Sequence, residues 1–245
     1  MEEVAIVAGG LGIRLEEIHE MMPKALLKID NTTILDRIVE TMTLALKNDF
    51  RLFIAAGIYF EKLSDYVSTQ EGAYSKVEVL EAKDWKEGNA ATLLALEDVI
   101  SKEEFILQMS DHLFSPETYR RCVQTKVVEA PFVCGEPKKE KLHDYLDLDD
   151  ATKILAKKDY RIQEIGKAIP NWNYIDMGIF RLTQPVFDTI GSLPKNRKSL
   201  SGYVNRWNSE HRFYVNPQPG AIWKDIDTPA DFEWAIQLDQ KGKWV

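Results

Sequence analysis

The stretch Val4-Ala5-Ile6-Val7-Ala8-Gly9-Gly10-Leu11-Gly12-Ile13-Arg14 places an apolar run directly before a glycine-rich turn. Five apolar residues in succession are typical of a strand that is buried on both faces of a parallel sheet. The glycines would let the backbone approach a polyanion and present several N–H groups to it. Arg14 would add a planar cation for phosphate oxygens. The stretch lacks the Lys-Ser/Thr of a P-loop and the third glycine of a dinucleotide fingerprint, so a plain tight turn is an equally good interpretation.

Strand and helix patterns alternate along the first half of the chain. Apolar runs predict strands at residues 4–8, 52–56, 77–80 and 105–109, and helical spacing predicts helices at 34–46, at 90–100 and from 116. Such alternation is typical of βαβ units with right-handed crossovers. It predicts an α/β fold with a Rossmann-like, mostly parallel sheet flanked by helices.

The pattern changes near Glu136, where the highly charged stretch 136–150 begins. Strand-like pieces follow at 152–156, 160–164 and 175–182, and Thr228-Pro229 opens a last helix that runs to about Leu238, with Thr as N-cap and Pro at the first helical position. We expect a single domain over residues 1–245 that contains a smaller substrate-side β insertion at about 136–175.

Composition narrows the class of protein. The 245 residues carry a net charge of −8 without a visible basic stripe, which argues against a nucleic-acid partner. No apolar run approaches the roughly 20 residues of a membrane helix, and the N-terminus lacks the layout of a signal peptide. Cys122 and Cys134 have no metal-like spacing, so we expect buried thiols in a reducing, cytoplasmic environment.

Three further segments carry candidate chemistry. Lys24 follows a proline and could stand as a fixed charge over phosphates, although most single lysines are solvated. Asp111 follows the strand at 105–109, at the edge where open α/β sheets bind ligands, and could hold Mg²⁺ or simply cap a turn. Asp225 and Asp227 alternate, so in an extended segment they share one face. One or both could supply a second carboxylate, or Asp227 could complement the dipole of the last helix.

The segment Glu87-Gly88-Asn89-Ala90 joins a loop to the helix predicted at 90–100. Asn89 is a plausible N-cap, and the backbone at Gly88 could accept the edge of a nucleobase. The two interpretations are compatible.

Taken together and in this order, these segments resemble the sugar-nucleotidyltransferase family over residues 4 to about 232. Within it the chain is most similar to the inositol-1-phosphate cytidylyltransferases. The motifs that carry the resemblance are Glu87-Gly88-Asn89-Ala90, Asp111-His112-Leu113-Phe114, Ala151-Thr152-Lys153-Ile154, Ile165-Gly166-Lys167, Trp172-Asn173-Tyr174-Ile175-Asp176 and the run from Trp223 to Asp231.

The resemblance implies a role for each matching residue. Arg14 and Lys24 would be catalytic, and Asp111 and Asp225 would hold Mg²⁺. The nucleotide would be bound by Ala8, Gly9, Gly10, Gly12, Glu87, Gly88, Asn89 and Ser110. The phosphorylated polyol would meet Glu164, Lys167 and Asp176, with Lys153 and Asn173 as further candidates.

The implied reaction is Mg²⁺-dependent transfer of a cytidylyl group from CTP to inositol 1-phosphate, which gives CDP-inositol and pyrophosphate. The base and the acceptor come from the resemblance alone. A sugar-1-phosphate uridylyl- or thymidylyltransferase, a cytidylyltransferase for another small phosphate or phosphonate, and a non-catalytic nucleotide sensor stay open. In related systems the cytidylyltransferase works with, or is fused to, a membrane enzyme that uses CDP-inositol, and here we expect such a partner to be a separate protein.

Overall fold

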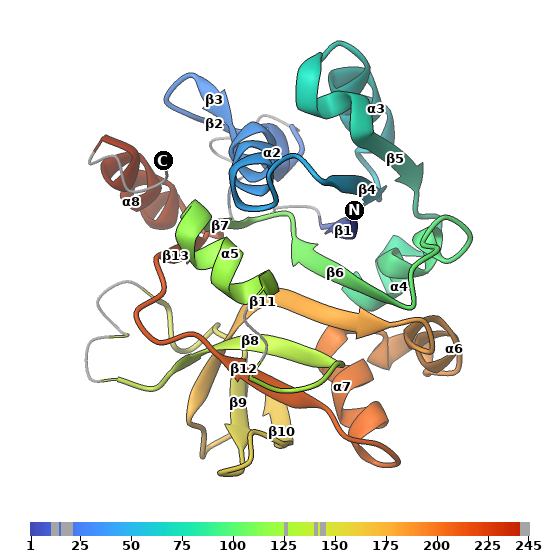
Figure 1. Cartoon of the computed structure of the whole chain (residues 1–245), viewed down its shortest axis with the longest axis vertical. Coiled ribbons are helices and arrows are strands. Elements are labelled where there is room, and N and C mark those ends of the chain that lie inside the picture. The colour runs from blue at the N-terminus through green and yellow to red at the C-terminus, as the bar shows by residue number, and fades with distance from the viewer. Residues whose placement is uncertain (11–14, 16–21, 125–126, 140–141, 143–145, 241–245) are drawn as a thin grey trace.

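The computed structural model describes residues 1–10, 15, 22–124, 127–139, 142 and 146–240. Its main sheet has the strand order β10-β9-β11-β6-β1-β4-β5, and β8 and β12 extend it beside β11. Figure 1 shows this sheet running through the molecule, from β5 at the top to β9 and β10 at the bottom. Among the described residues, no helix is long and apolar enough to cross a membrane.

The N-terminal half forms the parallel part of the sheet. β1 (Glu2–Ala8) lies between β4 (Phe50–Ala56) and β6 (Glu104–Met109), and β5 (Val77–Glu81) pairs with β4. All three pairings are parallel. These are the apolar runs that the sequence predicts as strands, so the expected α/β fold is confirmed.

The C-terminal half adds antiparallel strands to the same sheet. β11 (Tyr174–Thr183) pairs antiparallel with β6, β8 (Phe132–Pro137) and β9 (Lys153–Ala156). β10 (Ile162–Gly166) follows β9, and β12 (Tyr214–Pro217) runs parallel to β8. β9 and β10 therefore continue the edge of the main sheet, and the strand predicted at 160–164 begins two residues later.

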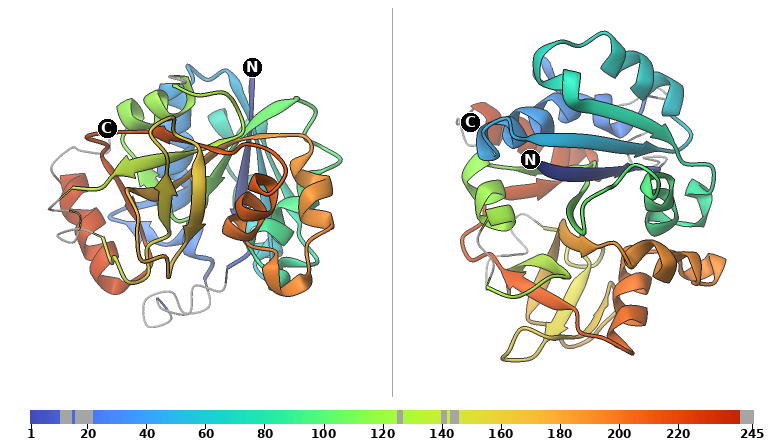
Figure 2. Two further views of the ribbon diagram at one scale, coloured as in Figure 1. Left: turned by 90° about the horizontal axis from the view of Figure 1, so that it is seen from below. Right: turned by 45° about the vertical axis from the view of Figure 1, so that its right-hand side comes forward.

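Alternate residues of β1 enter two different cores, which makes the molecule three-layered. Val4 and Ile6 pack with residues of α2, α3, α5 and α8, whereas Ala5 and Val7 pack with residues of α4, α6 and α7. Figure 2 shows these helices on opposite sides of the sheet. The helices are α2 (Ile34–Ala45), α3 (Phe60–Ser68), α4 (Asn89–Leu93), α5 (Pro116–Gln124), α6 (Val186–Gly191), α7 (Leu200–Asn208) and α8 (Pro229–Gln240).

Two small antiparallel sheets of two strands each are separate from the main sheet. β2 (Lys28–Ile29) pairs with β3 (Thr32–Thr33), and β7 (His112–Phe114) pairs with β13 (Trp223–Asp225). Short 3-10 turns occur at Lys24–Leu26, Gly72–Lys76, Trp85–Glu87, Leu94–Leu96 and Lys195–Arg197. The β7–β13 pair matters most here, because it joins the Asp111 segment to the Asp225 segment.

Several local predictions have clear outcomes. Cys122 and Cys134 are buried free thiols, as expected. Thr228 caps α8 as predicted: its hydroxyl oxygen accepts the Asp231 N–H at 3.3 Å, and Asp231 Oδ2 accepts the Thr228 N–H at 2.8 Å. The helix predicted at 90–100 is wrong in extent, because α4 ends at Leu93 and a 3-10 turn follows it.

Asn89 is not the N-cap of α4, because that position belongs to Gly88. Asn89 Oδ1 instead accepts the N–H of Leu200 at 2.9 Å, at the start of α7. The Lys198 carbonyl oxygen accepts the N–H groups of Ala90 and Ala91 at the start of α4. The two helix starts therefore satisfy each other's amides across more than a hundred residues of sequence.

Candidate active site

The candidate site lies where two neighbouring parallel strands end. Val7 of β1 is paired with Met109 of β6, so the residues that follow each strand leave the sheet at the same edge. Gly9-Gly10 follows β1 and Ser110-Asp111 follows β6. β4 pairs with the other side of β1, so later strands have been added on both sides of this first strand. The edge of an open α/β sheet at which the strand order reverses in this way is where ligands bind.

A large cavity of about 650 Å³ opens at this edge, a volume typical of small-molecule sites. It is lined mainly by the ends of β1 and β6, the Lys24 turn and the start of α4. Its described lining residues are Val7, Ala8, Gly9, Gly10, Pro23, Lys24, Ala25, Tyr59, Leu63, Trp85, Lys86, Gly88, Asn89, Thr92, Met109, Ser110, Asp111 and Asp227.

Two glycines are required by the shape of this cavity. A Cβ on Gly9 would lie 2.4 Å from the Thr92 hydroxyl oxygen. Gly88 has φ +133°, and a Cβ there would lie 2.2 Å from the Lys198 carbonyl oxygen. Both positions therefore bring backbone closer to neighbouring atoms than any side chain allows, and they leave the backbone of these turns facing the cavity.

Lys24 joins two acidic residues from distant parts of the chain. Its Nζ lies 3.0 Å from Asp111 Oδ2 and 2.5 Å from Asp227 Oδ1. The Lys24 side chain is only 14% exposed, which opposes its charge, but the two carboxylates outweigh burial and raise the pKa of Lys24 above its ordinary value. Lys24 is therefore a fixed ammonium group.

Asp111 is held by a second neighbour. Its Oδ1 lies 2.7 Å from His112 Nδ1. Burial raises the pKa of the Asp111 carboxyl, but Lys24 and His112 outweigh burial and hold that pKa well below its usual range. Burial likewise opposes the charged form of His112, while the carboxylates of Asp111, Asp225 and Asp176 raise the pKa of His112.

The acidic turn from Asp225 to Asp227 is held in place by the buried ammonium group of Lys224. Lys224 is 2% exposed, and its Nζ contacts Asp225 Oδ1 at 3.1 Å and also Asp231 Oδ1. The other oxygen of Asp231 accepts the Asp227 N–H at 3.2 Å. Lys224 and Asp231 thus fix the backbone between Asp225 and Asp227, and they separate the directions of these two carboxylates.

A smaller cavity of about 120 Å³ adjoins the large one, and the two share Asn89, Met109 and Asp227 in their walls. Its other lining residues are His112, Leu146, Asp150, Ala151, Thr152, Lys167, Ile175, Asp176, Gly178, Phe180, Leu200, Ser201, Trp223 and Asp225. Burial raises the pKa of Asp176 to about 6, although Asp176 accepts the N–H of Gly178 at 2.7 Å.

The structure brings most of the sequence-predicted residues to these two cavities. Ala8, Gly9, Gly10, Lys24, Gly88, Asn89, Ser110 and Asp111 line the large one, and Lys167, Asp176 and Asp225 line the small one. Gly12 and Arg14 lie outside the described residues. Lys167 Nζ lies 2.5 Å from Asp150 Oδ1.

Four predicted residues do not line either cavity. Glu87 contacts the ammonium groups of Lys195 and Lys198 at 2.6 and 3.0 Å. Lys153 donates to the Lys167 carbonyl oxygen at 2.8 Å, and Glu164 is exposed on β10. The Asn173 side chain exchanges two hydrogen bonds with the backbone of Ala156.

The family resemblance implied that Asp225 would hold Mg²⁺ together with Asp111, and it left the role of Asp227 open. The structure brings Asp227 to Lys24 and Asp111, whereas Asp225 faces the small cavity. Trp85 and Lys86 in the large cavity, and Asp150, Thr152 and Ser201 in the small one, were also not predicted as site residues. The Asp-x-Asp alternation was the one signal that pointed to Asp227.

The carboxylates of Asp111 and Asp227 suit a divalent cation. The Lys24 ammonium already lies between one oxygen of each, which shows that the two groups converge on a position for positive charge. Within the described part of the chain, no three acidic, His or Cys side chains form a metal site by themselves. Mg²⁺ commonly binds through one or two carboxylates plus substrate phosphates and water, so the residues present fit this ion.

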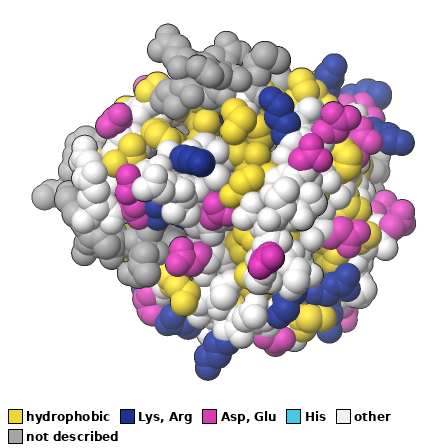
Figure 3. Space-filling view, turned by 90° about the horizontal axis from the view of Figure 1, so that it is seen from above, with side chains coloured by type: hydrophobic (Ala, Val, Ile, Leu, Met, Phe, Trp, Pro, Cys, Tyr) yellow, Lys and Arg dark blue, Asp and Glu magenta, His cyan; other side chains and the backbone are white. Residues whose placement is uncertain are grey.

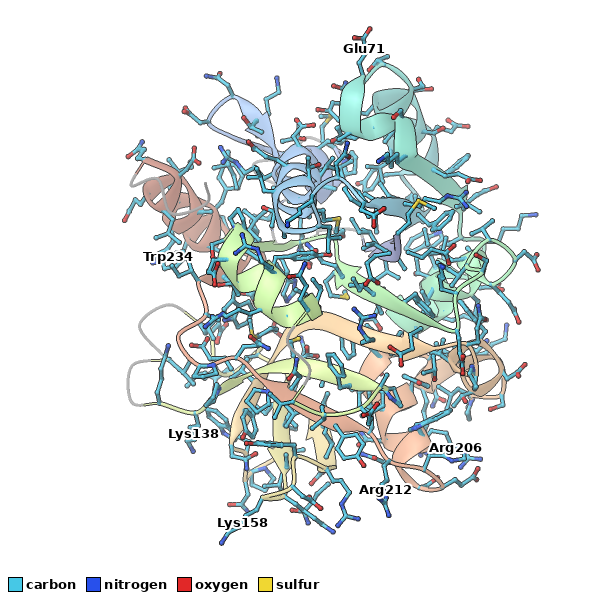
Figure 4. All side chains as sticks on the ribbon, viewed as in Figure 1. Glu71, Lys138, Lys158, Arg206, Arg212 and Trp234 are labelled. Atoms are coloured by element: carbon cyan, nitrogen blue, oxygen red, sulfur yellow. The ribbon has the colours of Figure 1, made fainter. Side chains whose placement is uncertain are left out.

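Away from this site the charges are mixed. Figure 3, which looks down on the face at the top of Figure 1, shows acidic and basic side chains interspersed with apolar ones on the described part of that face. A third cavity, of about 320 Å³, lies beside Arg161, His211 and Arg212. Lys158, Arg206 and Arg212 point outward at that end of the molecule, as Figure 4 shows.

Known proteins resemble this chain over nearly its whole length. A protein of Rubrobacter xylanophilus named bifunctional IPC transferase and DIPP synthase is 27% identical over 242 residues, which cover 96% of this chain and 51% of that protein. The chain thus spans about half the length of the curated relatives that it matches.

Solved structures share the fold. The inositol-1-phosphate CTP transferase from T. maritima superposes with a TM-score of 0.78 at 24% identity, over 98% of this chain and 96% of that one. A UDP-glucose pyrophosphorylase complexed with UDP-glucose has a TM-score of 0.82 at 16% identity, over 99% of each chain. The family resemblance seen in the sequence is confirmed: residues 4–242 match the family described as nucleotidyl transferase, and the chain belongs to that family.

Proposed function

We propose that this nucleotidyltransferase moves a cytidylyl group from CTP to inositol 1-phosphate and releases pyrophosphate. The observation that carries the proposal is the shared wall of the two cavities at Asn89, Met109 and Asp227. A nucleotide in the large cavity and a small phosphorylated acceptor in the other would meet there, beside the Lys24 ammonium. The choice of CTP and inositol 1-phosphate is supported by the names of the T. maritima protein and the curated relatives.

The nucleotide occupies the large cavity. The N–H groups of the Gly9-Gly10 turn and the Lys24 ammonium face its phosphates, with Ala8 and Ser110 at the strand ends beneath them. The base lies toward Gly88 and Asn89. Glu87 does not contact the nucleotide in this arrangement. Its ion pairs with Lys195 and Lys198 hold the Gly88 turn against the segment that precedes α7.

Asp111 and Asp227 would hold Mg²⁺, which would neutralise charge on the phosphates and polarise the bond that breaks. Neighbouring residues of the chain hold these two aspartates in place. His112 fixes one oxygen of Asp111, and the Asp231 carboxylate fixes the backbone of Asp227. Asp225 belongs to the acceptor side in this arrangement.

The acceptor occupies the small cavity, where Lys167 and Asp176 are its predicted contacts. A polyol needs several polar groups that can pair with hydroxyls. The walls supply such groups from several separate segments of the chain, and Asp150, Thr152 and Ser201 are among them. Lys153 and Asn173 support the surrounding turns and strands through their contacts with the Lys167 carbonyl oxygen and the Ala156 backbone.

In the reaction, a phosphate oxygen of the acceptor attacks the α-phosphorus of CTP in line with the bond to the β-phosphate. A new P–O bond forms, the bond to the bridging oxygen breaks, and pyrophosphate leaves with that electron pair. The attacking phosphate is already an anion, so the step needs no general base. Lys24 lowers the repulsion between the two anions, and the cavity walls align them.

A substrate matrix tests the proposal. CTP, UTP, dTTP, ATP and GTP are each combined with inositol 1-phosphate and with glucose 1-phosphate in the presence of Mg²⁺, and pyrophosphate release is measured. We expect turnover with CTP and inositol 1-phosphate. Turnover confined to glucose 1-phosphate with UTP or dTTP would identify the chain as a sugar-1-phosphate uridylyl- or thymidylyltransferase instead. Bound nucleotide without turnover in any pair would favour the sensor interpretation.

A further inference from the structure

His112 lies between the two cavities and uses only one of its ring nitrogens within the described structure. Nδ1 is 2.7 Å from Asp111 Oδ1, and the ring stacks on Trp223 with a centroid distance of 5.8 Å and an interplanar angle of 12°. The structure gives Nε2 no hydrogen-bond partner among the residues it describes. The ring itself lines the small cavity.

Gly178 leaves room for this nitrogen. Gly178 has φ +71°, and a Cβ at this position would lie 2.6 Å from His112 Cδ2 and 2.8 Å from Nε2. Gly178 also lines the small cavity. The Cβ would also lie 2.9 Å from His112 Cγ, so Gly178 packs against the face of the ring at a backbone position without a side chain, and the ring borders the space that the acceptor is proposed to fill.

The carboxylates of Asp225 and Asp176 lie in the same part of the small cavity as His112 and Gly178. Asp225 is directly opposite His112 in the β7–β13 pair, so their side chains lie on one face. Asp176 is turned toward Gly178 by the 2.7 Å hydrogen bond from the Gly178 N–H. Both residues line the small cavity with His112.

We propose that His112 Nε2 binds a hydroxyl group of the acceptor, so that His112 is a specificity-determining residue for hydroxylated acceptors. This inference rests on the proposed function and deepens it. A hydroxyl both donates and accepts, so it pairs with Nε2 in either protonation state of the ring. A phosphate group in this part of the cavity would face the carboxylates of Asp176 and Asp225, whereas a hydroxyl can donate to either of them.

The same ring then couples the two substrates. Its Nδ1 orients Asp111 on the nucleotide side, and its Nε2 contacts the polyol on the acceptor side. Two substitutions separate these contacts, because an asparagine amide reaches the position of Nδ1 and a glutamine amide reaches that of Nε2. His112→Asn keeps the group next to Asp111 and removes the group toward the acceptor, and His112→Gln does the reverse. His211→Asn is the matched control, since His211 is exposed and stacks on Trp207 outside both cavities.

Steady-state kinetics with CTP and inositol 1-phosphate give the first readout. In His112→Asn we expect kcat/KM for the acceptor to fall about 10- to 100-fold through KM, the usual effect of losing one hydrogen bond to a substrate hydroxyl. KM for CTP should stay within about twofold, and His211→Asn should match wild type. His112→Gln should recover much of the acceptor KM. An unchanged acceptor KM in His112→Asn, or an equal rise in both KM values, would overturn the inference.

Imidazole ¹⁵N spectra give a readout that does not need turnover, and the four histidines of the chain keep them simple. The resonance lost in His112→Gln should shift when inositol 1-phosphate is added and should not shift with inorganic phosphate alone. A wild-type enzyme that is inactive with this pair but shows the shift would refute the proposed reaction and keep the contact. Active wild-type enzyme with no shift, or with the same shift from inorganic phosphate, would refute the contact and keep the reaction.

Discussion

Replacing Lys24 by methionine removes the one ammonium group that the structure places between Asp111 and Asp227. The two carboxylates then face each other without the Lys24 ammonium between them. Removing one partner of a buried ion pair costs about 3–5 kcal/mol, and these aspartates are about one-fifth exposed, so we expect a loss of about 2–3 kcal/mol. For a chain of this length that loss corresponds to a fall in Tm of about 4–12 °C.

Magnesium should reverse this loss. In wild type, Lys24 competes with Mg²⁺ for the two carboxylates, whereas in Lys24→Met the position is free. An ion present at a hundred times its Kd stabilises the folded state by about 2.7 kcal/mol. We therefore expect Mg²⁺ to raise the Tm of the variant clearly more than that of wild type. Activity should nonetheless fall about 10²- to 10³-fold, because the charge over the phosphates is lost.

Thermal unfolding with and without Mg²⁺ measures both effects. Lys86→Met is the matched control, because Lys86 lines the same cavity but is exposed and lies 5.5 Å above the Trp85 ring. It should unfold within a few degrees of wild type at either Mg²⁺ concentration. Equal Tm values for Lys24→Met and wild type without Mg²⁺, or equal shifts on adding it, would refute the reasoning.

Three further predictions concern the neighbouring residues. Asp227→Asn should raise the Mg²⁺ concentration for half-maximal rate at least about tenfold, whereas Asp225→Asn should mainly raise KM for the acceptor. The opposite pattern in Mg²⁺ titrations would show that Asp225, and not Asp227, holds the metal. Gly88→Ala should lower the free energy of unfolding by about 1–3 kcal/mol because of its positive φ and the Lys198 carbonyl, while Gly191→Ala, which has open space, should change it by less than about 0.5 kcal/mol in urea. The pKa of Asp176 is raised to about 6 by burial, so the folded state holds this proton more tightly than the unfolded chain, whose Asp pKa is about 3.9. The free energy of unfolding should then fall as pH rises from about 4 to about 6, by at most about 3 kcal/mol, and urea titrations of Asp176→Asn across this range should lack that decrease.

The parallel half of the fold could be predicted because its strands are buried on both faces. β1, β4 and β6 each contain a mainly apolar run that ends at polar or turn residues. No comparable pattern marks β8 and β12, which contain glycine or proline: β8 is defined by its pairing with β11 and with β12, and β12 by its pairing with β8. Such pairing depends on residues about 40 to 80 positions away.

The residues of the candidate site likewise include some whose positions could be predicted from the sequence and some whose positions could not. Asp111 and the Gly9-Gly10 turn lie just after strands whose ends the sequence marks, so their meeting could be predicted, whereas the role of Lys24 came from the family resemblance. Asn89 could not be placed, because its partner is the first amide of α7. The choice between Asp225 and Asp227 depends on buried Lys224 and on Asp231, whose contacts with this turn appear only in three dimensions.

We propose that the chain joins the CMP group of CTP to a phosphorylated polyol. The most direct measurement follows the ³¹P NMR spectrum of wild-type protein with CTP, inositol 1-phosphate and Mg²⁺. We predict that the signals of CTP and inositol 1-phosphate decline together while a diphosphate diester and pyrophosphate appear in equal amounts. Unchanged CTP and inositol 1-phosphate, under conditions in which UTP or dTTP with glucose 1-phosphate gives a diester, would contradict the claim.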